Sequence, residues 1–228
     1  MLSKQELNLL VNGAKELNIT LSDTQIQQFD IYLDELQKWN ASINLTGLKT
    51  KDDIIIKHFI DSLSCGQVLE EYYPQDISNL WIIDIGSGAG FPGIPIKICY
   101  NIKKLVLLDS SKKKISFLKF ITNKLNLPNV MFLYGRAEDY MQNSDCKSKF
   151  DVVFARAFAK LKLSIEIALP FVKKDGLLVF QKGINVFDEI EGEENNIEEF
   201  GGKITEVKKI KIPFLDQIRH LVVIKKIK

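Results

Sequence analysis

The sequence predicts an α/β protein built on a doubly wound, mostly parallel sheet, with a helical extension at its N-terminus and an antiparallel hairpin at its C-terminus. From residue 80 onward, short continuous apolar runs alternate with helical segments. This alternation is typical of parallel strands that helices cover on both faces. The first run leads into a loop with three glycines in five residues, at the point where open α/β sheets bind their ligands.

Residues 1–75 are predicted to form helices that close one edge of the main domain. Residues 3–6 and 22–25 each have the form of a capping box, in which two side chains satisfy free amides at a helix start. A third helical stretch is expected over residues 54–69. After the second box, apolar side chains recur at spacings of three and four and form a stripe that must pack on another element: Ile26, Phe29, Leu33 and Leu36.

The predicted strands of the sheet are five apolar runs, at residues 80–85, 104–109, 130–134, 150–155 and 176–181. Because each run is continuous rather than alternating, we expect all five strands to be covered on both faces. Helices are predicted between them, for example at residues 112–125 and 161–172. We therefore expect residues 76–228 to form one compact unit after the helical extension.

The end of the chain has a different pattern. Residues 203–212 and 219–226 are strand-like and are joined by Pro-Phe-Leu-Asp, which predicts an antiparallel hairpin at the sheet edge. Before the hairpin, residues 188–199 hold seven acids and no Lys or Arg. Such a run is most simply a solvated helix face or loop, and we assign it no function.

The composition is that of a globular protein with reduced cysteines. The 228 residues suit one domain with an appendage, and 46% apolar with 26% charged residues exclude a disordered chain. Lys and Arg exceed Asp and Glu only by 31 to 29, so any polyanionic partner must be held by local patches. Cys65, Cys99 and Cys146 lack metal-ligand spacing, and no apolar run approaches the roughly 18 residues of a membrane span. We expect a cytoplasmic protein with no metal and no membrane contact.

The glycine-rich loop, residues 84–93, reads Asp-Ile-Gly-Ser-Gly-Ala-Gly-Phe-Pro-Gly. Gly86 and Gly88 allow a ligand to approach the backbone closely. A dinucleotide site needs Gly-x-Gly-x-x-Gly, but Phe91 stands where the third glycine is required.

Two acids near this loop favour a different ligand. Asp84 would repel a phosphate, and it suits a ligand with positive charge, such as the amino group and sulfonium of S-adenosylmethionine. An Asp beside a turn also has the alternative of bonding to nearby amides. Asp109 ends the next predicted strand, where it can accept hydrogen bonds from both ribose hydroxyls.

The assembly resembles the class I S-adenosylmethionine-dependent methyltransferases, which have a Rossmann-like sheet, and more narrowly the RsmG (GidB) family. That family methylates N7 of a guanine in bacterial 16S ribosomal RNA. The resemblance therefore implies an enzyme with S-adenosylmethionine as its cofactor and the 16S rRNA of the small ribosomal subunit as its partner. It covers nearly the whole chain and departs from the family pattern only in the acidic stretch. It rests on short motifs in order: Trp39-Asn40, Asn44-Leu45-Thr46, His58-Phe59-Ile60-Asp61-Ser62-Leu63, residues 84–95, Gly135-Arg136-Ala137-Glu138, Arg156-Ala157-Phe158-Ala159, Lys182-Gly183 and Arg219-His220-Leu221-Val222.

The resemblance implies cofactor contacts at Gly86, Phe91, Ala137, Glu138 and Arg156. Most of these agree with the chemistry of the residues. Gly86 lets the backbone approach the methionine part, Phe91 supplies apolar surface, and the segment at Ala137 and Glu138 follows a strand end where it can contact the adenine amino group. Arg156 is harder to explain, because a cation beside a sulfonium is unfavourable unless a carboxylate or an RNA phosphate lies between them.

The fourth predicted strand bears on the reaction. Enzymes that methylate exocyclic amines commonly carry Asn or Asp-Pro-Pro-aromatic there, and cytosine C5 enzymes need a Cys, but residues 155–158 are Ala-Arg-Ala-Phe. N7 of guanine has an in-plane lone pair and no proton to lose, so its methylation needs alignment and desolvation more than a base. We expect no catalytic acid, base or nucleophile. The family resemblance, and not the spacing, selects N7.

RNA binding is expected from basic residues of the motifs that grip phosphates around the pocket mouth: His58, Arg136, Arg156, Lys182 and Arg219. Phe158 offers a stacking face for a base taken out of its stack, although such an aromatic is more often part of a core. His58 has the alternative of a helix histidine bonded to Asp61 or backbone. Asp61 and Ser62 have the alternative of a buried pair without substrate contact. We expect a monomer.

Two other functions remain open from the sequence. One is a nucleotide-cofactor oxidoreductase, which Phe91 at the third-glycine position disfavours. The other is a regulatory protein that binds S-adenosylmethionine without transferring its methyl group. The motifs of Arg156 and Lys182 disfavour that alternative, because a protein that only senses the ligand needs no basic residues around the entrance of its pocket.

Overall fold

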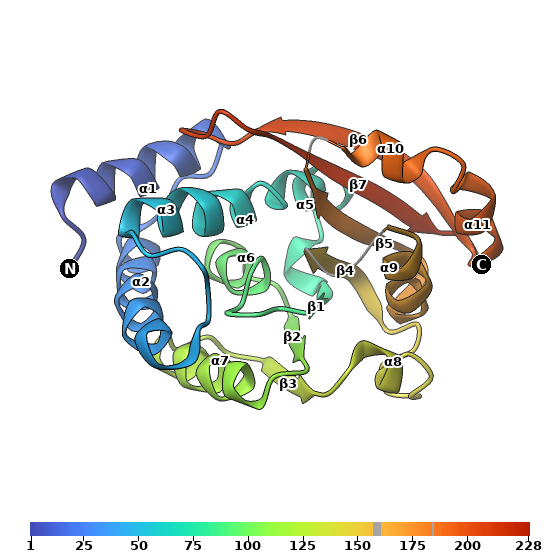
Figure 1. Cartoon of the computed structure of the whole chain (residues 1–228), viewed down its shortest axis with the longest axis horizontal. Helices are drawn as coiled ribbons and strands as arrows, with labels where there is room; N and C mark the ends of the chain where they lie inside the picture. The colour runs from blue at the N-terminus through green and yellow to red at the C-terminus, as the bar shows by residue number, and fades with distance from the viewer. Residues whose placement is uncertain (157–160, 184) are drawn as a thin grey trace.

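The computed structural model describes residues 1–156, 161–183 and 185–228 and confirms the predicted α/β class (Figure 1). Within this part of the chain, seven strands form one sheet in the order β3-β2-β1-β4-β5-β7-β6, in which β7 runs antiparallel to both β5 and β6 and the other pairs are parallel. The chain order reverses between β1 and β4, which is where such sheets open a ligand crevice. The strands are β1 (Trp81–Ile85), β2 (Lys104–Asp109), β3 (Val130–Tyr134), β4 (Phe150–Arg156), β5 (Val172–Lys182), β6 (Gly202–Lys211) and β7 (Ile218–Lys226).

The sheet separates two hydrophobic cores, because successive side chains of a strand point to opposite faces. Ile82 and Leu105 contribute to the core on one face, whereas Ile83 and Val106 contribute to the core on the other. The first core also contains residues of α6 (Gly93–Cys99) and α7 (Lys112–Lys124). The second contains residues of α8 (Ala137–Tyr140), α9 (Leu161–Ala168), α10 (Val186–Ile190) and α11 (Glu194–Glu199).

The N-terminal helices cover the first face of the sheet rather than only closing an edge. They are α1 (Lys4–Glu16), α2 (Asp23–Ile43), α3 (Lys51–Ile54), the π-helical turn η1 (Ile55–Ile60), α4 (Asp61–Leu63) and α5 (Gly66–Tyr72). Both predicted capping boxes form, at the starts of α1 and α2. Buried side chains of these helices belong to the same core as the strands, so the division at residues 75 and 76 stays a prediction.

Two sequence-based expectations are wrong, one about a strand and one about a helix. β3 is not covered on both faces: it lies at the sheet edge, where Met131 and Tyr134 are 48% and 56% exposed. The helix predicted over residues 161–172 ends at Ala168, and a 3-10 turn, η3 (Leu169–Phe171), leads directly into β5. Pro170 accounts for this early end, because a proline disfavours α-helical geometry in the residue before it.

No helix in the described ranges has both the length and the apolar character that crossing a membrane requires.

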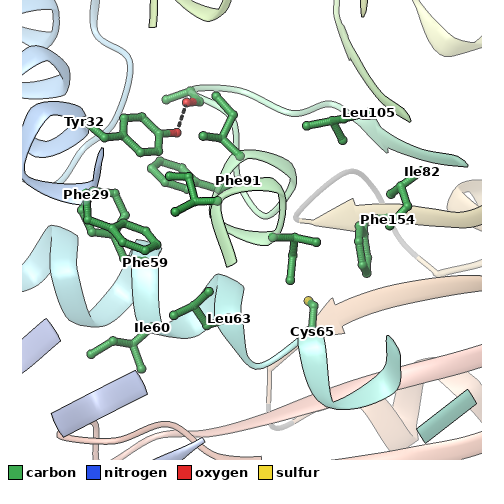
Figure 2. Packing of buried hydrophobic residues seen from close by; sticks show 14 of the residues in the cluster. Phe29, Tyr32, Phe59, Ile60, Leu63, Cys65, Ile82, Phe91, Leu105 and Phe154 are labelled. Atoms are coloured by element: carbon green, nitrogen blue, oxygen red, sulfur yellow. Dashed lines mark hydrogen bonds between the residues drawn. The ribbon is translucent and has the colours of Figure 1, made fainter. Parts of the chain in front are cut away.

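A buried aromatic cluster joins α2 to the glycine-rich loop (Figure 2). The ring of Tyr32 stacks on Phe59 and Phe91, with centroids 5.1 and 5.5 Å away. The Tyr32 hydroxyl donates a hydrogen bond of 2.5 Å to the carbonyl of Ala89. Burial raises the pKa of this hydroxyl well above its usual range, so it remains a donor. The N-terminal helices thereby fix the backbone of the loop.

Replacing Tyr32 with Phe is expected to lower the free energy of unfolding by about 1–3 kcal/mol, because the carbonyl of Ala89 loses its buried donor. Denaturant unfolding measures this change. The matched control is Tyr72→Phe, which removes an exposed hydrogen bond to Thr205 and should cost less than about 0.5 kcal/mol. Equal losses in the two variants would contradict the role given to Tyr32.

Candidate functional site

A cavity of about 370 Å³ opens at the carboxyl ends of β1, β2 and β4, beside the glycine-rich loop. Its volume is within the range of small-molecule sites. The cavity brings together six of the residues predicted from the sequence: Gly86, Asp109, Arg136, Ala137, Glu138 and Arg156. Leu108, Leu163 and Ile167 add apolar walls.

Two larger hollows lack this arrangement. One, of about 400 Å³, lies by Trp81 at the opposite end of the sheet, and the other, of about 640 Å³, is lined largely by acids of residues 188–193. Among the residues that the structure describes, no glycine lines either hollow, so neither offers the close backbone approach that the loop provides. We therefore take the cavity beside the loop as the candidate site.

The loop conformation requires its glycines. Gly86, Gly88 and Gly90 have φ values of 69°, 60° and 105°, in the left-handed region that disfavours other residues. A Cβ atom at Gly90 would stand 2.5 Å from the Ile94 side chain and 2.8 Å from the Tyr32 hydroxyl. The amides of Gly86 and Ser87 both donate to the carbonyl of Leu108, which ties the loop to the end of β2.

Asp109 holds the loop and also lines the cavity. One carboxylate oxygen accepts from the amide of Gly88 at 2.9 Å, and the other accepts from the amide of Ser111 at 2.8 Å. A carboxylate has about four acceptor positions, so these bonds leave capacity for ribose hydroxyls. Gly88 itself does not line the cavity, but its amide is bonded to Asp109, which does.

Asp84 lies beneath the loop and does not line the cavity. Its side chain is fully buried, and one carboxylate oxygen accepts from the amide of Gly93 at 2.8 Å. This is the turn-bonding alternative that the sequence left open. The other oxygen has no hydrogen-bond partner among the described residues. Burial raises the pKa of Asp84 to about 7, against the opposing effects of the Gly93 amide and Arg156.

Phe91 is turned into the core rather than into the cavity. Its ring is 6% exposed and stacks between Tyr32 and the imidazole of His58, whose centroid is 4.4 Å away. The predicted cofactor contacts of Phe91 and Asp84 therefore stay proposals, and the structure gives both residues a direct part in shaping the loop.

His58 is held as a neutral imidazole. Its Nε2 lies 2.6 Å from the Thr46 hydroxyl and its Nδ1 lies 3.2 Å from Nη2 of Arg156. Because arginine only donates, Nδ1 is the acceptor and Nε2 carries the hydrogen. Burial and the nearby Arg156 lower the pKa of His58 to about 3. A neutral ring has no charge with which to attract a phosphate, so His58 is better placed to orient Arg156.

The other predicted RNA contacts lie along the same end of the sheet. Arg156 neighbours Gln181 across β4 and β5, and Lys182 neighbours His220 across β5 and β7, next to Arg219. Arg136 is exposed at the cavity rim. Phe158 lies outside the described residues.

The acidic stretch is more than a solvated surface. Glu189 of α10 forms an ion pair of 2.8 Å with Lys182 and also accepts from the amide of Leu161. A phosphate that binds Lys182 must therefore compete with Glu189.

Sequence reasoning missed two residues that build this site. Tyr32 stands three residues after Phe29 on the apolar stripe of α2, and that spacing was the available signal. Asp61 was considered as a partner of His58 or as part of a buried pair with Ser62, yet its carboxylate lies within 3.4 Å of both Arg156 and Arg219. No local pattern signals a contact between residues 158 positions apart.

No group of three or more His, Cys, Asp or Glu side chains in residues 1–156, 161–183 and 185–228 is arranged to hold a metal ion. A metal-free reaction stays a prediction.

Replacing Asp84 with Asn is expected to change how stability depends on pH. The wild-type pKa is about 7 when folded and about 4 when unfolded. Between these values only the folded state keeps the proton, so wild-type stability falls as the pH rises. The variant lacks this loss, and its stability relative to wild type should rise between about pH 4 and 7 by at most about 4 kcal/mol.

Urea unfolding at a series of pH values measures this difference. Other titrating groups such as Asp61 and His58 are present in both proteins and cancel. The cost of placing an amide nitrogen at the unpartnered position is a constant offset. A difference between the variant and the wild type that is independent of pH would contradict the raised pKa.

Comparison with known proteins identifies the family of the chain. Solved structures share the fold at low identity: TYW2 of M. jannaschii in complex with AdoMet has a TM-score of 0.51 and 19% identity, over 69% of this chain and 74% of that one. The cyclase SpnF has a TM-score of 0.59 and 12% identity, over 92% and 98%. These likenesses concern the fold alone.

Curated relatives are much closer in sequence. Proteins named ribosomal RNA small subunit methyltransferase G from Thermoanaerobacter pseudethanolicus and Alkaliphilus metalliredigens are each 42% identical to this chain, over 99% and 96% of its length and 92% and 90% of theirs. The model of the family GidB, described as rRNA small subunit methyltransferase G, matches residues 25–222. The chain therefore belongs to the GidB family of rRNA small subunit methyltransferases.

Proposed function

We propose that the protein transfers the methyl group of S-adenosylmethionine to N7 of a guanine in the 16S rRNA of the small ribosomal subunit. The observation that carries this proposal is the cavity beside the glycine-rich loop, in a chain of the GidB family. The residues that line this cavity have the chemistry that binding of S-adenosylmethionine requires, which agrees with the family function.

The cavity residues suit the three parts of S-adenosylmethionine. Gly86 presents bare backbone to the methionine part, and the carboxylate of Asp109 is available to the ribose hydroxyls. Ala137 and Glu138, at the start of α8, would contact the adenine. Leu108 and Ile167 provide apolar surface for the rings. These assignments are proposals that rest on chemical fit.

The residues around the cavity favour a reaction that needs positioning rather than proton transfer. S-adenosylmethionine supplies an electrophilic methyl group, and guanine N7 supplies a lone pair without a proton to remove. Of the nearby groups, Asp109 is bonded to backbone amides and His58 is held neutral between Thr46 and Arg156. The site then contributes alignment and exclusion of water.

RNA binding would use the basic end of the sheet. Arg156, Lys182 and Arg219 lie on adjacent strands, where they can neutralise phosphates in spite of a net charge of only +2. A ribosomal RNA substrate supports a cytoplasmic location for the reaction. We also propose that the protein acts as a monomer, since Gly86, Asp109 and Arg156 of one chain converge on the cavity.

Family membership does not favour either alternative function. An oxidoreductase would bind NADH in place of S-adenosylmethionine, which equilibrium binding measures. A regulatory protein would bind S-adenosylmethionine tightly and transfer no methyl group to any RNA.

The direct test incubates the protein with labelled S-adenosylmethionine and small subunits or 16S rRNA from cells that lack it, followed by separation of the nucleosides. We expect label in 7-methylguanosine. Gly86→Val should reduce the rate on the order of 100-fold, since it strains the loop and crowds the cavity. Gly47→Val is the control, because a Cβ there meets no atom within 4 Å, and it should keep its activity. Label in another nucleoside would overturn the N7 assignment, and absence of label despite cofactor binding would favour the regulatory alternative.

A further inference from the structure

Asp61 places a buried carboxylate between two arginines of the proposed site. Its side chain begins α4, directly after η1, and is 1% exposed. One oxygen lies 3.4 Å from Nη2 of Arg156, and the other lies 3.3 Å from Nε of Arg219. The three residues come from α4, β4 and β7, so the cluster joins the N-terminal helices to the basic end of the sheet.

The surroundings hold this carboxylate in a fixed position. The backbone carbonyl of Asp61 accepts a hydrogen bond from the side-chain amide nitrogen Nε2 of Gln181 at 2.6 Å, and the same nitrogen lies 3.3 Å from the Ser64 hydroxyl. Arg156 is restrained in turn, because its Nη2 donates to the carbonyl of Lys57 and contacts His58. These contacts restrain both side chains of the ion pair.

Both oxygens of Asp61 face guanidinium groups, which are permanent cations that only donate, and this favours the ionised carboxylate. Burial raises the pKa of its carboxyl, and Arg156 and Arg219 act against that rise. Breaking such a buried pair by removing one charge is costly, since the remaining charges are left uncompensated.

The charge of Arg156 bears on which ligands the cavity can bind. Arg156 lines the cavity, and the proposed cofactor carries a sulfonium cation that an arginine repels. Asp109 and Glu138 lie at the same cavity, but neither is paired with Arg156 in an ion pair among the described residues. Asp61 is the carboxylate that contacts Arg156 directly, and it also offsets Arg219.

We propose that Asp61 is a positioning residue whose buried carboxylate offsets one of the two charges of the Arg156–Arg219 pair, so that a cavity wall formed by an arginine accepts a positively charged sulfonium ligand. The inference rests on the proposed function and deepens it. The cluster of two cations and one anion keeps a net charge of +1 with its arginines fixed in place. Without Asp61, Arg156 in the wall and the neighbouring Arg219 would together be two uncompensated cations.

The test compares a charged ligand with its neutral counterpart. Isothermal titration calorimetry of the whole chain would measure binding of S-adenosylmethionine, a sulfonium, and of S-adenosylhomocysteine, the uncharged thioether that lacks the methyl group. Asp61→Asn preserves the shape of the side chain and removes its charge. We expect the variant to lose on the order of tenfold more affinity for the sulfonium than for the thioether.

A second variant distinguishes charge from structure. Arg219→Gln added to Asp61→Asn restores the net charge of the cluster, so the ratio of the two affinities should return toward the wild-type value. Arg219→Gln alone should shift the ratio in favour of the sulfonium, and it serves as the test should Asp61→Asn not fold. The matched control is Asp151→Asn, near the start of β4 and so at the other end of this strand from Arg156. The carboxylate of Asp151 is largely buried, pairs with Lys173 and accepts from the amide of Trp81. It should leave the ratio unchanged.

Equal losses of affinity for both ligands in Asp61→Asn, or no shift in either Arg219 variant, would overturn the inference while leaving the methyltransferase proposal intact. A wild-type chain that binds neither ligand would instead overturn the proposed function. The two failures are therefore distinguishable.

Discussion

The hydrogen bond from Tyr32 to the carbonyl of Ala89 is the contact on which the geometry of the site depends. It closes a buried stack in which Phe91 lies between Tyr32 and His58. Because Phe91 is part of the glycine-rich loop, the same cluster that fills the core under α2 also fixes the backbone that lines the cavity. The loop glycines then follow as a requirement, since the backbone is left-handed at Gly86, Gly88 and Gly90 and Tyr32 fills the space beside Gly90.

A chain of polar contacts extends this support to the basic end of the sheet. Thr46 holds His58, His58 contacts Arg156, and Arg156 shares Asp61 with Arg219. Each of these contacts joins segments that are distant in the sequence. The N-terminal helices therefore contribute to the site in two ways, by supporting the cofactor loop and by holding the arginines.

The features that local sequence could predict were those with a local cause. Apolar runs, capping boxes and the glycine spacing identified the strands, the helix starts and the loop, because each depends on residues within a few positions of one another. Exposure of β3 at the sheet edge was missed because the apolar content of a strand does not reveal its place in the sheet order. The early end of α9 was missed although Pro170 was the available signal.

The electrostatics of the site were the least predictable part. The cation at Arg156 called for a carboxylate or a phosphate beside it, but the sequence did not identify Asp61 as that carboxylate, which lies 95 positions earlier in the chain. The role of Glu189 was hidden in the same way, since an acidic run is usually solvated. In both cases the partner is set by the fold, at the place where strands β4 and β5 end and β7 begins.

The central claim is that the N-terminal helices and the glycine-rich loop form one binding unit. Hydrogen–deuterium exchange of the full chain, with and without S-adenosylmethionine, tests it most directly. We expect the ligand to slow exchange in residues 86–93 and also in residues 55–63, because His58 stacks on Phe91 of the loop and, with Asp61, contacts Arg156 at the cavity. Protection confined to residues beyond 76 would contradict the claim and would make the N-terminal helices a separate appendage.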